Sequence, residues 1–466
     1  MPLPVLIDCG TSVDDALALL LAARSSALEM LGITCVTGNV PLPAVAPNCL
    51  CTRLAEEQRQ TTGDGRRVPD TRPSTPDTRH LLHTETPMSE HLSYEDMLAE
   101  IAAQPENLSR LFESTDRMLR DVLTPKQILA LHRVFLTGCG DSHHASLCAE
   151  MAFEALAGLP CEPMTAMQMA RYAANHIPTP FPDDPLVVGI SVSGSVARTA
   201  EAVAQARRRG ALVLGLTGNP EGALAKAAHG HIARMHIPAQ AQVPGTISYA
   251  ANLSALLLLA IRLGEIRNVY PQTVANDLRA ELRGVYDVMA ATIDANQKLA
   301  AQLADEYAAV PEFVFTGHGP NYGSALFSAA KIIEASGASA WGQDTEEWAH
   351  LQYFCKHSPT PTFVIAPPGS GYSRSLELVK VMKRIGRRVI AVVDSGDTEI
   401  ARLADVVLPV VGEVREAFSP LVYTLAGELF AAYHSRATGE PPFRDFAGIY
   451  ALENAGGNII YTEAVE

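Results

Sequence analysis

The segment that decides the fold is Phe135-Leu136-Thr137-Gly138-Cys139-Gly140-Asp141-Ser142, in which an apolar run ends in a glycine-rich polar loop. A similar segment, Phe313-Val314-Phe315-Thr316-Gly317-His318-Gly319-Pro320, follows at an offset of 179 residues, counted from Gly138 to Gly317. The correspondence continues at an offset of 176 residues, from 188–194 to 364–370 and from 210–217 to 386–393. Buried strands that end in Gly/Ser loops and lead into helices are typical of a parallel, doubly wound sheet. The sequence therefore predicts an α/β protein with two tandem doubly wound domains.

The rest of the chain is divided around this repeat. Residues 51–87 are rich in Arg, Thr, Pro, Asp and Gly, and their few apolar residues predict a disordered linker. Apolar spacing predicts helices over 94–103 and 105–123, and strands over 4–8 and 32–36 with a helix through Leu31 between them. We expect a βα fragment at 1–50, the linker at 51–87, lead-in helices at 88–125, the first domain at 126–270, a connecting helix at 271–300, the second domain at 301–425, and a C-terminal helix and tail at 426–466.

The composition narrows the kinds of partner. Lys plus Arg number 36 and Asp plus Glu 51, a formal net charge of −15, which argues against a polyanion-binding surface and hence against nucleic acid.

No apolar run reaches the roughly 18 residues of a membrane span, since Leu253–Ile261 ends at Arg262. Residues 1–5 hold no basic region, so we expect no secretory signal and a cytoplasmic location. The eight cysteines form no CxxC pair, which predicts reduced thiols. We expect neither a metal nor an organic cofactor.

Two loops of the first half have the composition of a phosphate site. The candidate residues lie at the ends of two predicted strands and in the following helix: Gly140, Ser142, Ser191, Ser193, Gly194 and Thr199. Free backbone N–H groups and helix N-termini at strand ends favour an anion, and small hydroxyl side chains add neutral donors. The alternative is a pair of ordinary serine-rich helix caps. In the second half, Pro367 and Pro368 replace Ser191 and Val192 and remove two N–H donors. We therefore expect one phosphate site per chain.

Residues 95–466 resemble the isomerase portion of the glucosamine-6-phosphate synthase family, which consists of two sugar isomerase (SIS) domains. The segment Met97–Glu106 is similar to the MxxEIxxQPE signature of that family. Gly138–Ser142 resembles its CGTS loop, and Ser191–Gly194 resembles its SQSG phosphate loop. The resemblance implies a sugar phosphate as the small-molecule partner.

The resemblance also implies a catalytic set in the second half. Lys331-Ile332-Ile333-Glu334 matches the KLKE motif, whose glutamate moves a proton between sugar C1 and C2, so Glu334 is the candidate base. Lys331, one helical turn earlier, could steady that carboxylate. His350 matches the ring-opening histidine, which reaches in from a neighbouring subunit and implies a homodimer. The alternatives are a solvated Lys/Glu surface pair, and an exposed face around Glu346 with Trp348 as its one packed aromatic residue.

Departures from the family leave the reaction open. Gly448 stands where the family has a functional lysine, and Ser195 and Val196 replace the Glu-Thr of the phosphate loop. We expect no glutaminase domain, and hence no ammonia from glutamine in this chain. The expected activity is aldose–ketose isomerisation, or deamination or deglycation of an amino-sugar or ketosamine phosphate. The competing possibility is a non-catalytic phosphosugar-binding regulator.

Residues 3–49 resemble the start of an inosine–uridine nucleoside hydrolase. The stretch Leu6–Ala16 is similar to the calcium-binding DxDPGxDD segment, but Gly10 replaces its middle aspartate, a calcium ligand and the base for water. We therefore expect an inactive fragment, with calcium-dependent nucleoside hydrolysis as the minor alternative.

Overall fold

The computed structural model describes the backbone of two strands near the N-terminus and residues 92–451, apart from 179–183, 229–231, 235–242 and 358. The chain divides into two units, Met1–Thr84 and Glu85–Glu466. The predicted linker at 51–87 lies outside the described residues.

The first unit contains two parallel strands, β1 (Leu3–Cys9) and β2 (Leu28–Cys35). Both predicted strands are present, but β2 begins before Gly32. Residues 28–31, predicted as the end of a helix, are extended instead, because 28–30 pair with the start of β1 and Leu31 lies at a shift in the register. The remainder of that predicted helix lies outside the described residues.

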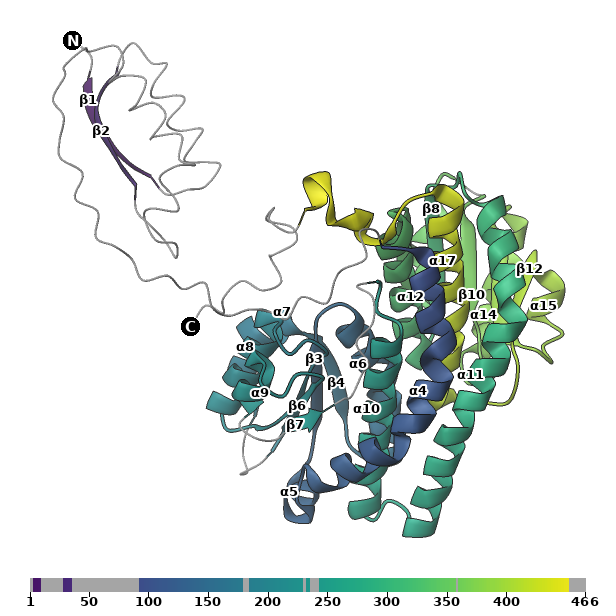
Figure 1. Cartoon of the computed structure of the whole chain (residues 1–466), viewed down its shortest axis with the longest axis horizontal. Helices are drawn as coiled ribbons and strands as arrows, with labels where there is room; N and C mark the ends of the chain where they lie inside the picture. The colour runs from purple at the N-terminus through teal and green to yellow at the C-terminus, as the bar shows by residue number, and fades with distance from the viewer. Residues whose placement is uncertain are drawn as a thin grey trace. The chain divides into compact units, whose positions relative to one another are not determined.

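The second unit contains two five-stranded parallel sheets with the same strand order (Figure 1). The first sheet has the order β4-β3-β5-β6-β7, and the second has the order β9-β8-β10-β11-β12. The strands are β3 (Val134–Gly138), β4 (Cys161–Thr165), β5 (Leu186–Ser191), β6 (Leu212–Thr217), β7 (Ile232–Arg234), β8 (Glu312–Gly317), β9 (Ser339–Asp344), β10 (Pro361–Ile365), β11 (Arg388–Asp394) and β12 (Val406–Val410). Two doubly wound sheets with one order confirm the predicted fold class.

Each sheet is covered on both faces, which accounts for its nearly continuous apolar strands. In β3, Val134 and Leu136 belong to a core shared by both domains, while Phe135 belongs to a separate core under the outer helices of the first domain. In β8, Phe313 faces the shared core and Val314 faces the outer core of the second domain. The alternation of side chains along a strand therefore assigns each residue to one of two layers.

Long helices fill the space between the two sheets, and shorter helices cover the outer faces (Figure 1). The inner helices are α4 (Tyr94–Asp121), α6 (Asp141–Ala157), α10 (Ile247–Ile266), α11 (Gln272–Glu306), α12 (Pro320–Ser336) and α17 (Leu425–Thr438). The others are α5 (Pro125–Ala130), α7 (Ala166–Arg171), η2 (Ala173–Asn175), α8 (Ala197–Arg208), α9 (Ala223–Ala228), α13 (Thr345–His350), η3 (Gln352–Phe354), α14 (Tyr372–Arg384), α15 (Ile400–Leu403), η4 (Glu416–Phe418), α16 (Pro420–Tyr423), η5 (Pro442–Phe446) and η6 (Gly448–Tyr450).

The lead-in segment is one helix, not the two predicted. Helix α4 begins after Ser93, whose side chain accepts a hydrogen bond from the Asp96 N–H, and it continues through Pro105 to Asp121. Proline removes one backbone donor from a helix interior. Burial of Pro105 together with Ile101 and Leu108 places this stretch in the apolar core, where packing offsets the lost bond.

Helix α10 is long and apolar enough to cross a membrane by length and composition alone, but 89% of its most apolar window is buried inside the protein. It packs against α4, α6 and α11 in the shared core. Its apolar composition is therefore explained by its position between the two sheets.

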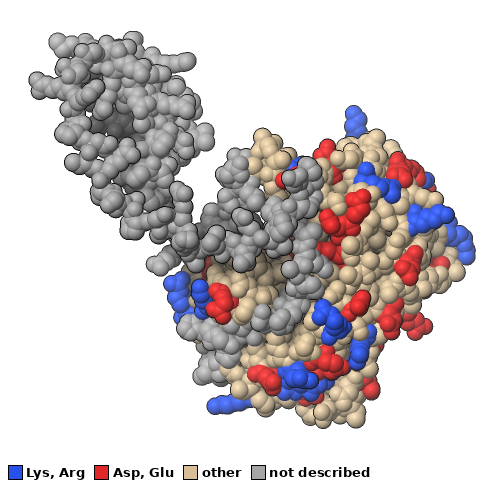
Figure 2. Space-filling view, viewed as in Figure 1, with Lys and Arg blue, Asp and Glu red and all other residues tan. Residues whose placement is uncertain are grey.

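On the face in view, acidic and basic side chains are interspersed over the described surface (Figure 2).

Helices α6 and α12 connect the two domains by direct packing. Each follows the first strand of its domain and begins after a glycine with a positive φ of 52°, Gly140 and Gly319. The helices are in close contact at Gly323, where a Cβ atom would lie 2.5 Å from Cys148 Sγ and 2.6 Å from the His144 carbonyl oxygen. This contact admits no side chain at position 323.

Gly323→Ala is therefore expected to lower the free energy of unfolding by about 1–3 kcal/mol, because the two helices must separate to admit the methyl group. Gly284→Ala is the matched control, since a Cβ atom at this exposed position of α11 meets nothing within 4 Å. The control should be neutral, or stabilising by up to about 1 kcal/mol, through helix propensity. Urea unfolding measures both; equal stability of the two variants would contradict the close packing.

Candidate active site

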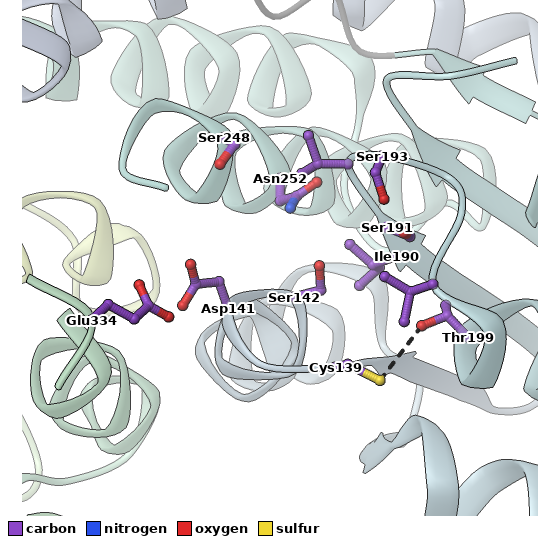
Figure 3. Close-up of a pocket in the computed structure, with 12 residues that line it drawn as sticks. Cys139, Asp141, Ser142, Ile190, Ser191, Ser193, Thr199, Ser248, Asn252 and Glu334 are labelled. Atoms are coloured by element: carbon purple, nitrogen blue, oxygen red, sulfur yellow. Dashed lines mark hydrogen bonds between the residues drawn. The ribbon is translucent and has the colours of Figure 1, made fainter. Parts of the chain in front are cut away.

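A cavity of about 340 Å³ opens at the carboxyl ends of β3 and β5 (Figure 3). Its lining comes from both halves of the repeat and from α10. The lining residues are Cys139, Asp141, Ser142, Ile190, Ser191, Val192, Ser193, Val196, Thr199, Ser248, Asn252 and Glu334. The cavity thus brings all four of the predicted phosphate-binding hydroxyl residues together with the predicted base.

The two phosphate-loop candidates lie side by side because β3 and β5 are neighbours in the sheet. Ser142 lies in the first turn of α6. Ser191 ends β5, and its Oγ is buried without a hydrogen-bond partner among the described residues. Thr199 Oγ1 lies 3.8 Å from Cys139 Sγ and links the second loop to the first. Buried hydroxyl groups at the N-termini of two helices form a neutral site suited to an anion.

Gly194 holds the turn of the second loop. Its φ is +66°, and a Cβ atom there would lie 2.8 Å from Thr217 Oγ1 and 3.0 Å from the Asn219 carbonyl oxygen. Both the backbone conformation and the available space therefore require glycine. Beside it, Ser193 Oγ accepts hydrogen bonds from the backbone N–H and the hydroxyl of Ser195.

Lys331 is the centre of the ionic contacts at the other end of the cavity. Its Nζ lies 2.6 Å from Asp141 Oδ2 and 2.5 Å from Glu334 Oε2, and it donates to the Gly245 carbonyl oxygen at 3.4 Å. The Lys331 side chain is 0% exposed, whereas those of Asp141 and Glu334 are 24% and 30% exposed. The alternative of a solvated surface pair therefore does not describe this lysine.

Burial and ion pairing set the protonation of these groups. Burial raises the pKa of Glu334 to about 7; the Lys331 charge opposes this shift and Asp141 adds to it. Burial alone would lower the pKa of Lys331, but the two carboxylates raise it overall. Nearby, burial raises the pKa of Glu100 to about 7 and that of Glu428 to about 8. Lys331 thus stays charged while Glu334 can exchange a proton near neutrality.

His350 does not line this cavity. It ends α13, its side chain is 65% exposed, and its Nε2 lies 3.3 Å from Glu346 Oε1. Trp348 of the same helix is fully buried. Within one chain, this arrangement matches the alternative interpretation of the segment, an exposed helix face with one packed aromatic residue. The predicted role of His350 requires a second subunit and stays a prediction.

The sequence reasoning missed the wall that α10 contributes. Ser248 and Asn252 lie four residues apart on this otherwise apolar helix and face the cavity. Asn252 is 1% exposed, and both its Oδ1 and its Nδ2 lack a hydrogen-bond partner among the described residues. Two polar residues at helical spacing in an apolar run were the available signal. The contact of Asp141 with Lys331, and its place in the cavity lining, were also not predicted from the sequence.

The corresponding position in the second domain is occupied by a carboxylate. A Cβ atom on Gly369, in the loop after β10, would lie 2.6 Å from both carboxylate oxygens of Glu416. A negative charge at this loop disfavours an anion. This arrangement adds to the loss of donors at Pro367 and Pro368 as a reason to expect one phosphate site per chain.

Comparison with known proteins places this geometry in a family. Residues 127–262 match the SIS domain model. The chain is 31% identical over 347 residues to a glutamine–fructose-6-phosphate aminotransferase (isomerizing) from Gloeobacter violaceus, covering 73% of this chain and 55% of that protein. It is 30% identical over 342 residues to the Thermus thermophilus protein of the same name, covering 72% and 55%. The chain thus spans about half the length of the curated relatives it matches. It contains a SIS domain and is homologous to the isomerase portion of these aminotransferases.

Solved structures share the fold. The C-terminal domain of glucosamine-fructose-6-phosphate aminotransferase from Francisella tularensis superimposes with a TM-score of 0.65 at 19% identity, covering 74% of this chain and 96% of that one. Tagatose-6-phosphate ketose/aldose isomerase from Escherichia coli gives 0.64 at 19% identity, covering 76% and 96%. Glucosamine-6-phosphate deaminase from Thermotoga maritima gives 0.56 at 21% identity, covering 74% and 97%.

The N-terminal resemblance is also found by a family model. Residues 5–126 match the inosine-uridine preferring nucleoside hydrolase model. This range extends beyond the residues 3–49 that carried the resemblance, and it includes α4, which packs with α10, α11 and α17 in the second unit. The matched range and the compact units therefore do not coincide.

Lys331→Met is expected to reduce the free energy of unfolding at pH 8 by about 3–5 kcal/mol, because two partly buried carboxylates lose their shared cation. Without the lysine, the pKa of Glu334 rises further above its unfolded value. The variant should therefore lose stability as the pH rises and be less impaired at pH 5.5. Urea unfolding at both pH values, with exposed Lys298→Met as control, checks this. Wild-type stability of Lys331→Met at pH 8 would contradict the assignment.

Proposed function

We propose that this chain is a sugar-phosphate enzyme that transfers a proton between C1 and C2 of its substrate. Ser142, Ser191, Ser193 and Thr199, with the backbone at Gly140 and Gly194, hold the phosphate, and Glu334 is the base. The observation that carries the proposal is that one cavity is lined by both phosphate loops and by the Glu334 carboxylate. A substrate anchored by its phosphate would present its other end to this base.

The proton transfer proceeds through one type of intermediate for every candidate substrate. Glu334 removes the C2 proton of an open-chain aldose to form an enediol, and return of the proton to C1 gives the ketose. If C2 carries an amine, the same transfer leaves an imine at C2; water adds to this carbon and ammonia departs. For a ketosamine, transfer from C1 to C2 leaves the imine at C1, and hydrolysis releases the amine. Lys331 keeps the Glu334 carboxylate in position throughout.

The names of the structural neighbours support this range of reactions, since they include a ketose/aldose isomerase and an amino-sugar phosphate deaminase. We further propose that the enzyme is a cytoplasmic homodimer in which His350 completes the site of the partner subunit and opens the sugar ring.

Glu334→Gln is expected to abolish turnover, with a loss of about a thousandfold or more, while binding of a hexose or amino-sugar phosphate persists. The amide keeps the volume of the side chain, and the ion pair of Lys331 with Asp141 remains. Ser191→Ala is the complementary variant and should weaken phosphosugar binding. Product release and isothermal titration calorimetry measure the two properties.

The wild-type enzyme should also show the titration of this base. Because Glu334 acts deprotonated and burial raises its pKa to about 7, kcat/KM should fall as the pH drops below about 7 and level off above it. Unchanged turnover in Glu334→Gln would refute the assignment of the base.

Mixing inactive variants tests the shared site. Dimers of Glu334→Gln and of His350→Gln should regain activity when they exchange subunits, because the heterodimer contains one intact site. Mixing Glu334→Gln with Ser191→Ala is the matched control and should give no activity beyond the residual activity of Ser191→Ala, since these two residues belong to one chain's cavity. A fully active monomer in analytical ultracentrifugation would refute the role of His350.

The second candidate function is ligand binding without catalysis. It is favoured by Gly448 at the position of the family lysine and by the absence of His350 from the cavity of a single chain. A wild-type protein that binds sugar phosphates and never turns them over would establish this alternative.

A further inference from the structure

The charges that line the cavity are all of one sign. Asp141 and Glu334 are the acidic residues of its lining, and no Lys, Arg or His is found among the described residues that form it. Lys331 lies behind them, with no exposed side-chain surface. Lys331 is the cation that both carboxylates pair with, while the guanidinium of Arg444 donates to the Ile333 and Glu334 carbonyl oxygens and contacts neither carboxylate in a hydrogen bond. A sugar phosphate brings a further dianion into this cavity, and a substrate that also carries a positive charge would fit it better.

One carboxylate oxygen of Asp141 receives no hydrogen bond from the described residues. Its Oδ2 accepts a hydrogen bond from Lys331, whereas its Oδ1 is buried and has no hydrogen-bond partner among the described residues. The Nδ1 atom of His144, which is also buried without a hydrogen-bond partner among the described residues, is 3.8 Å from Oδ1, beyond hydrogen-bond distance. Burial lowers the pKa of His144 to about 4, so this ring is neutral at physiological pH. A buried carboxylate oxygen without a donor is costly unless a ligand supplies one.

The position of Asp141 suits contact with the reacting end of the substrate. It precedes Ser142 of the phosphate loop and approaches Glu334 through their shared contact with Lys331 (Figure 3). A substrate group bound by Asp141 would therefore lie close to the carbon atom from which Glu334 takes a proton. It would lie either next to that carbon or on the side of it that faces the phosphate. In the resembling CGTS loop this position is a neutral threonine.

We propose that Asp141 is a specificity-determining residue that accepts a hydrogen bond from a protonated amine of the substrate. The substrate class is then the amine-bearing sugar phosphates, namely amino-sugar or ketosamine phosphates, in preference to those that carry only hydroxyl groups. This inference rests on the proposed function and selects deamination or deglycation over simple isomerisation. An ammonium group supplies charge-assisted hydrogen bonds, which are stronger than those of a hydroxyl group.

The test uses two open-chain analogues that lack a carbonyl group and cannot react, the 6-phosphates of glucitol and of 2-amino-2-deoxyglucitol. Calorimetry at neutral pH should show that the wild-type protein binds the amino analogue about tenfold more tightly, as expected for a hydrogen bond to a charged group. The preference should disappear as the pH rises through the pKa of the amine.

Asp141→Asn and Asp141→Thr should reduce the preference to about twofold or less, whereas exposed Asp277→Asn should retain it. Thermal melting checks that each variant is folded. The comparison of the two analogues on the wild-type protein does not depend on the folding of any variant. Equal wild-type affinity for the two analogues, or a preference retained without Asp141, would overturn this inference alone. Failure of both analogues to bind would overturn the proposed function as well.

Discussion

The contact on which the site depends is the buried ammonium group of Lys331, held between Asp141 of the first domain and Glu334 of the second. A fully buried lysine is stable only when its charge is paired. The packing of α6 against α12 provides this pairing, because it brings together two carboxylates that are 193 residues apart in the chain. These two ion pairs join domains that also share one apolar core, and they place the Glu334 carboxylate beside the loops after β3 and β5.

Much of this arrangement is encoded locally and could be predicted from the sequence. The repeated strand–glycine–helix pattern predicted both parallel sheets, and the serines after β3 and β5 lie along one cavity because neighbouring parallel strands end at one edge. Local patterns failed where distant contacts decide the structure. Pro105 suggested a helix break that core packing overrides, and residues 28–30 pair as a strand with β1.

The candidate site was predicted less completely for the same reason. Glu334 was found through a motif, but nothing in the residues around Asp141 indicates that a lysine from the other half of the chain contacts it. Asn252 lies in a largely apolar helix, and its spacing from Ser248 marks a polar side of that helix without showing what it faces. Its amide becomes informative once the structure places it against the cavity without a partner. His350 is the opposite case, since a motif indicated it and one chain does not bring it to the cavity.

The close approach of α6 and α12 at Gly323 also constrains how a substrate can enter. A clamshell motion that parted the two domains would break this contact and expose the ammonium group of Lys331 to water. A movement of the short loops that end β3 and β5 would open the cavity further without breaking either contact. A ligand could then enter or leave through rearrangement of a few serine and glycine residues, while the Glu334 carboxylate stays paired with Lys331.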